Sequence, residues 1–168
     1  MLALTCTTAV MDGTSDLNRS IRTEATRLFE ESYTRVFGSN IRITPQGESF
    51  FRRFYERFFA ASPRVPMLFS QTDMDRQIPM LKKSLHHVVA LYVTDTITDY
   101  LREIAERHRV LGIDAELYDL WLDCLMDTVR EFDTQCDMST ELAWRLALTP
   151  TITYMKLSGS DRAPLQGP

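Results

Sequence analysis

The stretch DYLREIAERHRVLGID, residues 99–114, surrounds one histidine with charged side chains. A helix turns by about 100° per residue, and on that period the charged residues share one side while His108 lies on the other. His108 is then in the middle of an apolar stripe. The stripe consists of Leu101, Ile104, Ala105 and Leu111. Gly112 follows, as glycine does where helices end. The pattern predicts a short helix that turns an ionisable side chain toward a core.

Periodicity leaves two interpretations of His108 open. An inward histidine is a core residue bonded to a carbonyl oxygen, or it is the ligand of a metal. In either case one ring nitrogen needs an acceptor. The carbonyl of Ile104, one turn earlier, is the expected acceptor for that nitrogen.

The remaining chain has the helical period as well, and no segment alternates with period two, so the sequence predicts an all-α fold. The segments NIRITPQG and RVPMLF are expected to be a linker and an irregular corner. Asp114 is expected to cap the helix that follows the histidine segment. The expected helices cover residues 20–37, 48–62, 73–92, 99–111, 115–132 and 139–157.

The length of 168 residues favours one domain. We expect a flexible N-terminal arm over residues 1–19, the folded domain over 20–157 and a disordered tail over 158–168. The net charge is −4 and no basic stripe is present, which argues against nucleic acid as a partner. The sequence shows neither a signal peptide nor a membrane span, and its three cysteines are far apart, so a reducing cytoplasm is expected.

Two further polar residues fall on apolar helix faces. Gln77 lies at the edge of the stripe formed by Leu81 and Leu85, while His86 and His87 point to the opposite, polar side. Tyr55 lies within a belt of phenylalanines. A buried tyrosine or glutamine is most often structural, because its polar tip needs only a partner.

The order of these residues resembles a known family. FYERFFAASPRVPMLF is similar to the FY…LF…P.V…LF segment of bacterial single-domain globins and flavohaemoglobin-type globins. IAERHRVLGIDAELY is similar to their IA..H...GV....Y segment. The resemblance extends from about Leu28 to Leu157 and implies a globin fold of six to eight helices around a haem pocket.

The resemblance also implies roles for individual residues. His108 would be the proximal ligand of the haem b iron, and Phe69 would stack on the haem. Tyr55, Gln77 and Leu81 would form the distal ligand site. The residues implied to line the haem pocket are Phe69, Leu81, Leu85, Leu111, Ile113 and Tyr118.

A haem pocket of this kind implies binding of O₂, NO and CO. Tyr55 and Gln77 can both donate hydrogen bonds to bound O₂, each worth about 1–3 kcal/mol, so slow O₂ release is expected. Dioxygenation of NO would be an accessory activity and would need an external electron donor or reductase. The catalytic relatives pair the proximal tyrosine with a glutamate on the last helix. Here no acidic residue occurs between Trp144 and Asp161.

Two alternatives remain from the sequence. The first is a haem-based gas sensor that signals through its N-terminal arm or a dimer interface, and the oligomeric state is left open. The second is a globin-fold interaction module without haem, which would have no need of His108, Phe69, Tyr55 and Gln77 together.

Overall fold

The computed structural model describes residues 8–38 and 44–159, and no strand occurs in these ranges. This confirms the all-α prediction. None of the helices in the described part is long and apolar enough to cross a membrane. The helices are α1 (Thr8–Phe37), α2 (Pro45–Ala61), α3 (Arg64–Leu68), α4 (Met74–Thr94), α5 (Asp99–Val110), α6 (Ala115–Phe132) and α7 (Met138–Gly159).

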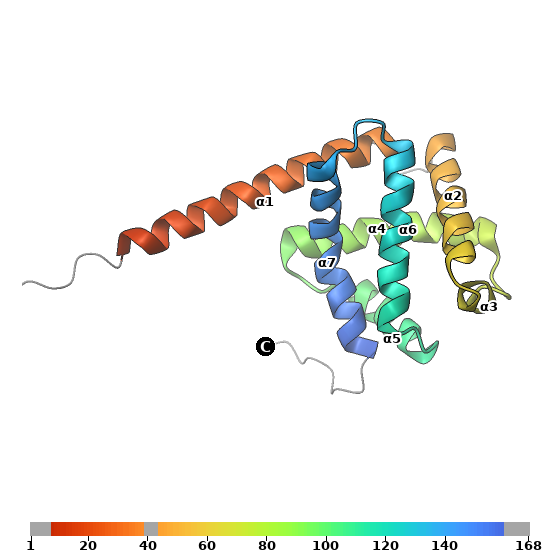
Figure 1. Cartoon of the computed structure of the whole chain (residues 1–168). Coiled ribbons are helices and arrows are strands. Elements are labelled where there is room, and N and C mark those ends of the chain that lie inside the picture. The colour runs from red at the N-terminus through yellow and green to blue at the C-terminus, as the bar shows by residue number, and fades with distance from the viewer. Residues whose placement is uncertain (1–7, 39–43, 160–168) are drawn as a thin grey trace, which may run out of the picture.

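Helix α7 is the centre of the bundle (Figure 1). It packs against α1, α4, α5 and α6, and α2 packs mainly against α6. Helix α4 runs across the bundle and also contacts α2 and α5. Helix α4 contributes to both core clusters: the large one, which contains the buried residues of α2, and a smaller one, which contains Leu101 and Ala105 of α5.

The core is aromatic, as the phenylalanine belt of α2 predicts. Phe50, Phe51 and Phe54 are fully buried, and Phe37 stacks on Phe51 with a centroid distance of 5.2 Å. Trp144 of α7 closes the same cluster. Rings of this size contribute most of the apolar area that a small helical domain buries.

Local signals set the boundaries around α5 correctly. Thr98 accepts a hydrogen bond from Leu101 N, and Asp114 accepts one from Leu117 N, so both act as N-caps. Gly112 has a φ of 67°, a left-handed conformation that favours glycine. The predicted cap at Asp114 and the predicted helix end at Gly112 are therefore confirmed.

Several boundaries differ from the prediction. Helix α2 begins at Pro45, so residues 45–47 of the expected linker are helical. Helix α1 begins at Thr8 rather than near Ser20, so residues 8–19 are helical, while residues 1–7 of the expected arm lie outside the described residues. No proline interrupts residues 8–37. Hydroxyls there bond back to the helix, as Thr23 Oγ1 does to the carbonyl of Arg19. The polar composition of residues 8–19 therefore does not by itself show that they belong to a continuous helix.

The expected corner RVPMLF is also helical over residues 64–68. Pro66 fits because it lies in the first turn, where a helix needs few backbone donors. At the other end of the chain α7 continues to Gly159, two residues into the expected tail. Residues 160–168 of that tail lie outside the described residues.

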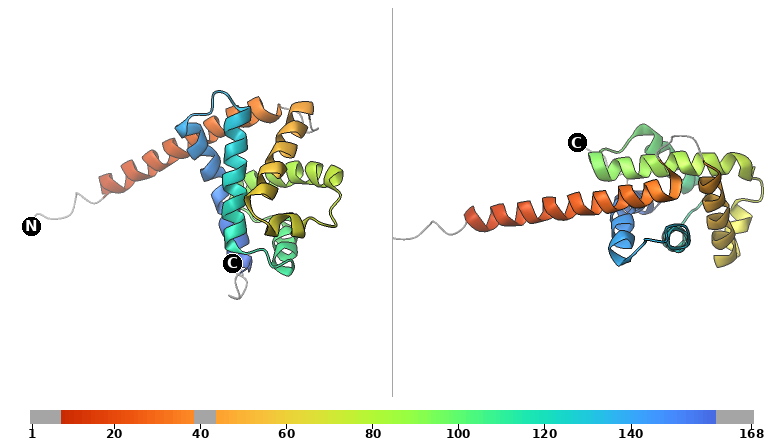
Figure 2. Two further views of the ribbon diagram at one scale, coloured as in Figure 1. Left: turned by 45° about the vertical axis from the view of Figure 1, so that its right-hand side comes forward. Right: turned by 90° about the horizontal axis from the view of Figure 1, so that it is seen from above.

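The first half of α1 extends beyond the bundle in every view (Figures 1 and 2). Ile21 is 52% exposed, and Leu17 one turn earlier is 60% exposed. The stripe that buries Ala25 and Phe29 against the bundle therefore continues outward without a covering element in the described chain.

A buried polar network joins α1 to the end of α6 and to α7. Asp133 accepts hydrogen bonds from Ser32 at 2.6 Å and from both Nε and Nη2 of Arg35 at 2.8 Å. Trp144 Nε1 donates to Ser32 Oγ at 2.9 Å. Burial raises the pKa of Asp133, but the hydrogen bonds from Arg35 and Ser32 outweigh burial and lower it.

We expect Asp133→Asn to destabilise the protein by about 2 kcal/mol at pH 7, because the Arg35 guanidinium loses its anionic partner. The folded-state pKa of Asp133 is depressed, so its contribution is complete above its ordinary value of 3.8 and is lost as the pH falls through the lower folded value. Urea unfolding from pH 7 to pH 2 measures this. The two proteins should converge at the acid end. Exposed Asp119→Asn is the control, and an equal loss there would refute the assignment.

Candidate functional site

The distal group predicted from the sequence assembles between α2 and α4. Gln77 Nε2 donates a hydrogen bond to Tyr55 Oη at 3.1 Å. Tyr55 is only 5% exposed. Burial raises its pKa to about 12, although the hydrogen bond from Gln77 acts in the opposite direction. At neutral pH the hydroxyl keeps its proton, so it accepts from Gln77 and can still donate to a ligand.

Phe69 reaches the same site from the C-terminal end of α3. Its ring lies 5.6 Å from that of Tyr55 and 5.5 Å from that of Phe59. Tyr55 and Phe59 are 5.7 Å apart, so the three rings form a triangle. Sequence reasoning placed Phe59 in the phenylalanine belt without assigning it to the site. Its position one turn after Tyr55 is the signal that identifies it.

Leu81 and Leu85 follow Gln77 along the inner face of α4. Both are buried in the same core cluster as Tyr55, and Phe69 packs against that cluster. The predicted arrangement of the α4 stripe is therefore confirmed. An apolar wall beside two hydrogen-bond donors is the usual composition of a small-molecule pocket.

His108 lies on α5, mostly withdrawn from solvent. Its Nδ1 is buried and has no hydrogen-bond partner among the described residues. The predicted bond from this ring to the carbonyl of Ile104 is therefore wrong. Burial lowers the pKa of His108 below its usual 6.5, which favours the neutral imidazole that binds metals.

Tyr118 and Ile113 come to the His108 side of the core. The Tyr118 ring meets the imidazole edge to face, with centroids 5.9 Å apart. Burial raises the pKa of Tyr118 to about 12. Both Tyr118 and Ile113 pack against the core cluster that holds Tyr55, Leu81 and Leu85. Tyr118 also packs against a second, smaller cluster of Leu91, Leu101, Ala105 and Met155, so it connects helix α5 with the core that holds the distal residues.

Leu111 differs from its prediction. It follows the last residue of α5 as the C-cap and is 59% exposed, so its expected place on the buried stripe is wrong. The helical period places it correctly only if the helix continues, and α5 ends at Val110.

The donor set of this core suits a haem better than a bare ion. In the described ranges no three His, Cys, Asp or Glu side chains come together as a metal site. A bare transition metal needs several protein ligands, whereas a porphyrin supplies its own nitrogens and needs one axial imidazole. A buried neutral imidazole with an unpartnered nitrogen, beside a large apolar core, fits that requirement.

Other polar groups lie away from this core. His86 is exposed, as predicted from its place on the polar side of α4, and His87 is half-buried. Cys124 is buried on α6, which packs against α2 and α7.

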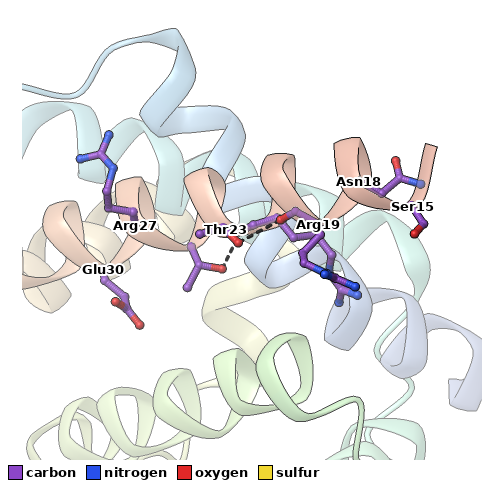
Figure 3. A pocket seen from close by; sticks show the side chains of 8 residues that line it. Ser15, Asn18, Arg19, Thr23, Arg27 and Glu30 are labelled. Atoms are coloured by element: carbon purple, nitrogen blue, oxygen red, sulfur yellow. Dashed lines mark hydrogen bonds between the residues drawn. The ribbon is translucent and has the colours of Figure 1, made fainter. Parts of the chain in front are cut away.

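A separate hollow of about 840 Å³ lies along α1 (Figure 3). It is open and lined by polar side chains, and none of the predicted site residues borders it. Its lining residues are Ser15, Asn18, Arg19, Arg22, Thr23, Thr26, Arg27 and Glu30. The hollow therefore has no part in the site formed by α2, α4 and α5.

An all-helical bundle that holds a Tyr–Gln pair between α2 and α4 and a half-buried histidine on α5 is consistent with the class of helical haem-binding proteins. Residues 52–155 match the family model Globin, and the chain belongs to the globin family. A solved structure from Pseudomonas aeruginosa PAO1, described as structurally highly homologous to a human hemoglobin, superposes with a TM-score of 0.71 at 33% identity. The superposition covers 82% of this chain and 99% of that one.

Curated relatives give the same family. Flavohemoproteins of Bacillus thuringiensis subsp. konkukian (strain 97-27) and Bacillus cereus (strain ATCC 10987 / NRS 248) are each 30% identical over 93 residues. The match spans 53% of this chain but only 23% of each relative. Membership of the globin family implies haem-based binding of a gaseous ligand such as O₂.

We expect Phe69→Ala to lower the free energy of unfolding by about 2 kcal/mol, since two ring contacts are lost at a half-buried position. Urea unfolding of the apoprotein measures this independently of haem. Met67→Ala on the same short helix, where the side chain is exposed, is the matched control. A loss for Phe69→Ala no larger than that of the control would show that the aromatic triangle does not organise the site.

Proposed function

We propose that this chain binds haem b through His108 and uses the haem to hold O₂ and other diatomic ligands. The observation that carries the proposal is the unpartnered Nδ1 of His108, buried beside the core that contains the hydrogen-bonded Tyr55–Gln77 pair. An orphaned polar atom in a core costs free energy unless a partner satisfies it. An axial bond would occupy one ring nitrogen and fix the orientation of the ring.

When bound, haem supplies the iron at which diatomic ligands attach. The chain would hold it between α4 and α5. Phe69, Leu81, Leu85 and Ile113 would supply apolar contacts, and Tyr118 would fix the imidazole from the side. Apolar burial of a cofactor of this size contributes much of its affinity.

Tyr55 and Gln77 would set the ligand affinity. Oxygen carries partial negative charge when bound, and both side chains have protons to donate in a low-dielectric pocket. The bond from Gln77 orients the Tyr55 hydroxyl so that its proton is free for the ligand. Slow O₂ release follows, which suits scavenging or ligand chemistry better than simple storage.

Dioxygenation of NO is the accessory activity we propose. It would consume one electron per turnover, so an external reductase or small reductant would have to restore the ferrous state. No carboxylate in the described part of the chain hydrogen-bonds Tyr118, and α7 presents Met155 to the α5 side of the core. The proximal side therefore offers no carboxylate relay, which favours slow turnover.

A gas-sensing role is the second candidate, and the projecting half of α1 is what favours it. Leu17 and Ile21 are exposed there at successive turns, which leaves an apolar stripe available to a signalling partner. In this case CO binding should change hydrogen exchange in residues 8–22. Exchange that is identical with and without CO would remove the support for sensing.

The His108→Ala variant should lose the haem Soret band, or retain only weakly bound haem that added imidazole restores. The reason is that no second histidine faces the core. His86→Ala is the control, because that ring lies on the outer side of α4. Absorption spectra of the ferric, ferrous and ferrous–CO forms check this. A spectrum that is unchanged in His108→Ala would refute the axial assignment.

Tyr55→Phe and Gln77→Leu should each speed O₂ dissociation by about 5- to 150-fold, since each removes a donor worth about 1–3 kcal/mol. Stopped-flow replacement of O₂ by CO measures the rate. Tyr154→Phe on α7 is the control for a tyrosine outside the site. Rates that stay within twofold of the parent protein in both variants would contradict the proposed distal role.

A further inference from the structure

Helix α4 has an unusual charge distribution for an acidic chain. From Arg76 to Thr94 it contains no Asp or Glu, although the protein carries a net charge of −4. Two of the three lysines and two of the three histidines of the whole chain occur within residues 82–87. Between Arg76 and Thr94 this helix therefore carries basic side chains without any acidic residue of its own.

The outer face of α4 presents this charge to solvent. Lys83 and His86 are exposed, and Met80 is 48% exposed beside them. Lys83 Nζ lies over the ring of Tyr100, 4.8 Å from its centroid. No carboxylate in the described ranges comes within ion-pair distance of Lys83. By contrast, arginines such as Arg109 are paired with neighbouring acids.

Contacts with α5 hold this face in place. Ser84 Oγ and Tyr100 Oη are 3.2 Å apart, and the rings of His87 and Tyr100 lie 4.4 Å apart. Burial lowers the pKa of His87, and the charges of His86 and Lys83 lower it further. Lys83, His86 and His87 therefore form a small cluster of basic side chains on this face.

Acidic residues near this face lie on α5 and at the two ends of α4. On α5, Asp99 and Glu103 flank Tyr100 and are exposed, and Glu103 lies 4.0 Å from Arg107. Asp75 Oδ1 accepts a hydrogen bond from Arg52 Nη2 of α2 at 3.0 Å, so this arginine compensates its negative charge. Asp95 follows the last turn of α4 and lies 3.9 Å from Arg22. The middle of the helix, from Met80 to His87, thus combines positive charge with an exposed thioether, a composition that suits a transient protein interface.

The opposite side of the same helix carries Gln77, Leu81 and Leu85. A helix with its side chains is about 10–12 Å across, so a protein seated on the outer face would lie one helix diameter from the proposed haem pocket. Met80 directly precedes Leu81. The distance between the outer face of α4 and the proposed haem pocket is therefore short enough for an electron to pass from a protein docked on this face to the haem.

We propose that the outer face of α4, defined by Met80, Lys83, His86 and His87, docks a small acidic electron-transfer protein that reduces the haem. The inference rests on the proposed function, because it concerns the external electron donor. In the step, a reduced flavin of the partner loses one electron to ferric iron, which becomes ferrous. A nucleic acid would need a longer basic stripe than this face provides.

Charge reversal at Lys83 tests the docking. Reduction of the ferric protein by a photoreduced bacterial flavodoxin is followed by stopped flow, and Lys83→Glu should slow the second-order rate about tenfold at low salt. The difference should largely vanish near about 0.3 M salt. Arg19→Glu on α1 makes the same change in net charge and should stay within twofold of the parent protein. Photoreduced riboflavin, which is small and neutral, should reduce all three proteins equally.

A binding measurement separates docking from haem chemistry. Fluorescence anisotropy of labelled, oxidised flavodoxin is titrated with the ferric protein and with its apoprotein at low salt. We expect Lys83→Glu to weaken binding severalfold and Arg19→Glu to leave it unchanged. Equal weakening by both substitutions would show a general charge effect and overturn the proposal, as would binding to anionic lipid vesicles but not to flavodoxin.

The outcomes also distinguish failure of this surface from failure of the proposed function. If the protein forms a CO complex with a His108-dependent Soret band but Lys83→Glu neither slows reduction nor weakens binding, the haem assignment stands and the docking face is wrong. If the protein takes up no haem at all, the proposed function fails, and the anisotropy titration still decides whether the α4 face binds an acidic partner.

Discussion

The buried imidazole of His108 imposes the strictest constraint on this structure. Helix α5 is otherwise strongly charged, yet it aims this ring at an apolar core and leaves Nδ1 without a partner among the described residues. A fold retains such a group only where a ligand, water or strain-bearing function compensates for it. The Tyr118 ring against the imidazole and the Tyr55–Gln77 pair between α2 and α4 support our proposal that the compensating ligand is a haem.

Much of the site followed from local sequence signals. Thr98, Asp114 and Gly112 fix the ends of the helices around His108, and helical periodicity alone places Gln77, Leu81 and Leu85 on one face. The same reasoning failed where an element ended early or continued. Leu111 falls outside the core because α5 stops before it, and α1 continues back to Thr8 because polar residues without proline can still form a helix.

Long-range features could not be read from the sequence. Ser32 contacts Asp133 and Trp144, which follow it in the sequence by 101 and 112 residues. No local sequence pattern indicates these contacts. The triangle of Tyr55, Phe59 and Phe69 also depends on how α3 turns the chain, and that segment was expected to be irregular. Periodicity gives the face of a helix, whereas the partner of that face is set by the packing of the whole bundle.

The axial bond from His108 is the central claim, and resonance Raman spectroscopy of the ferrous protein tests it directly. We expect an iron–imidazole stretching band that shifts when histidine is labelled with ¹⁵N and that persists in a protein lacking both His86 and His87. With those two residues removed, His108 is the only histidine left in the chain. Loss of the band in that protein, or a band insensitive to the label, would contradict the account.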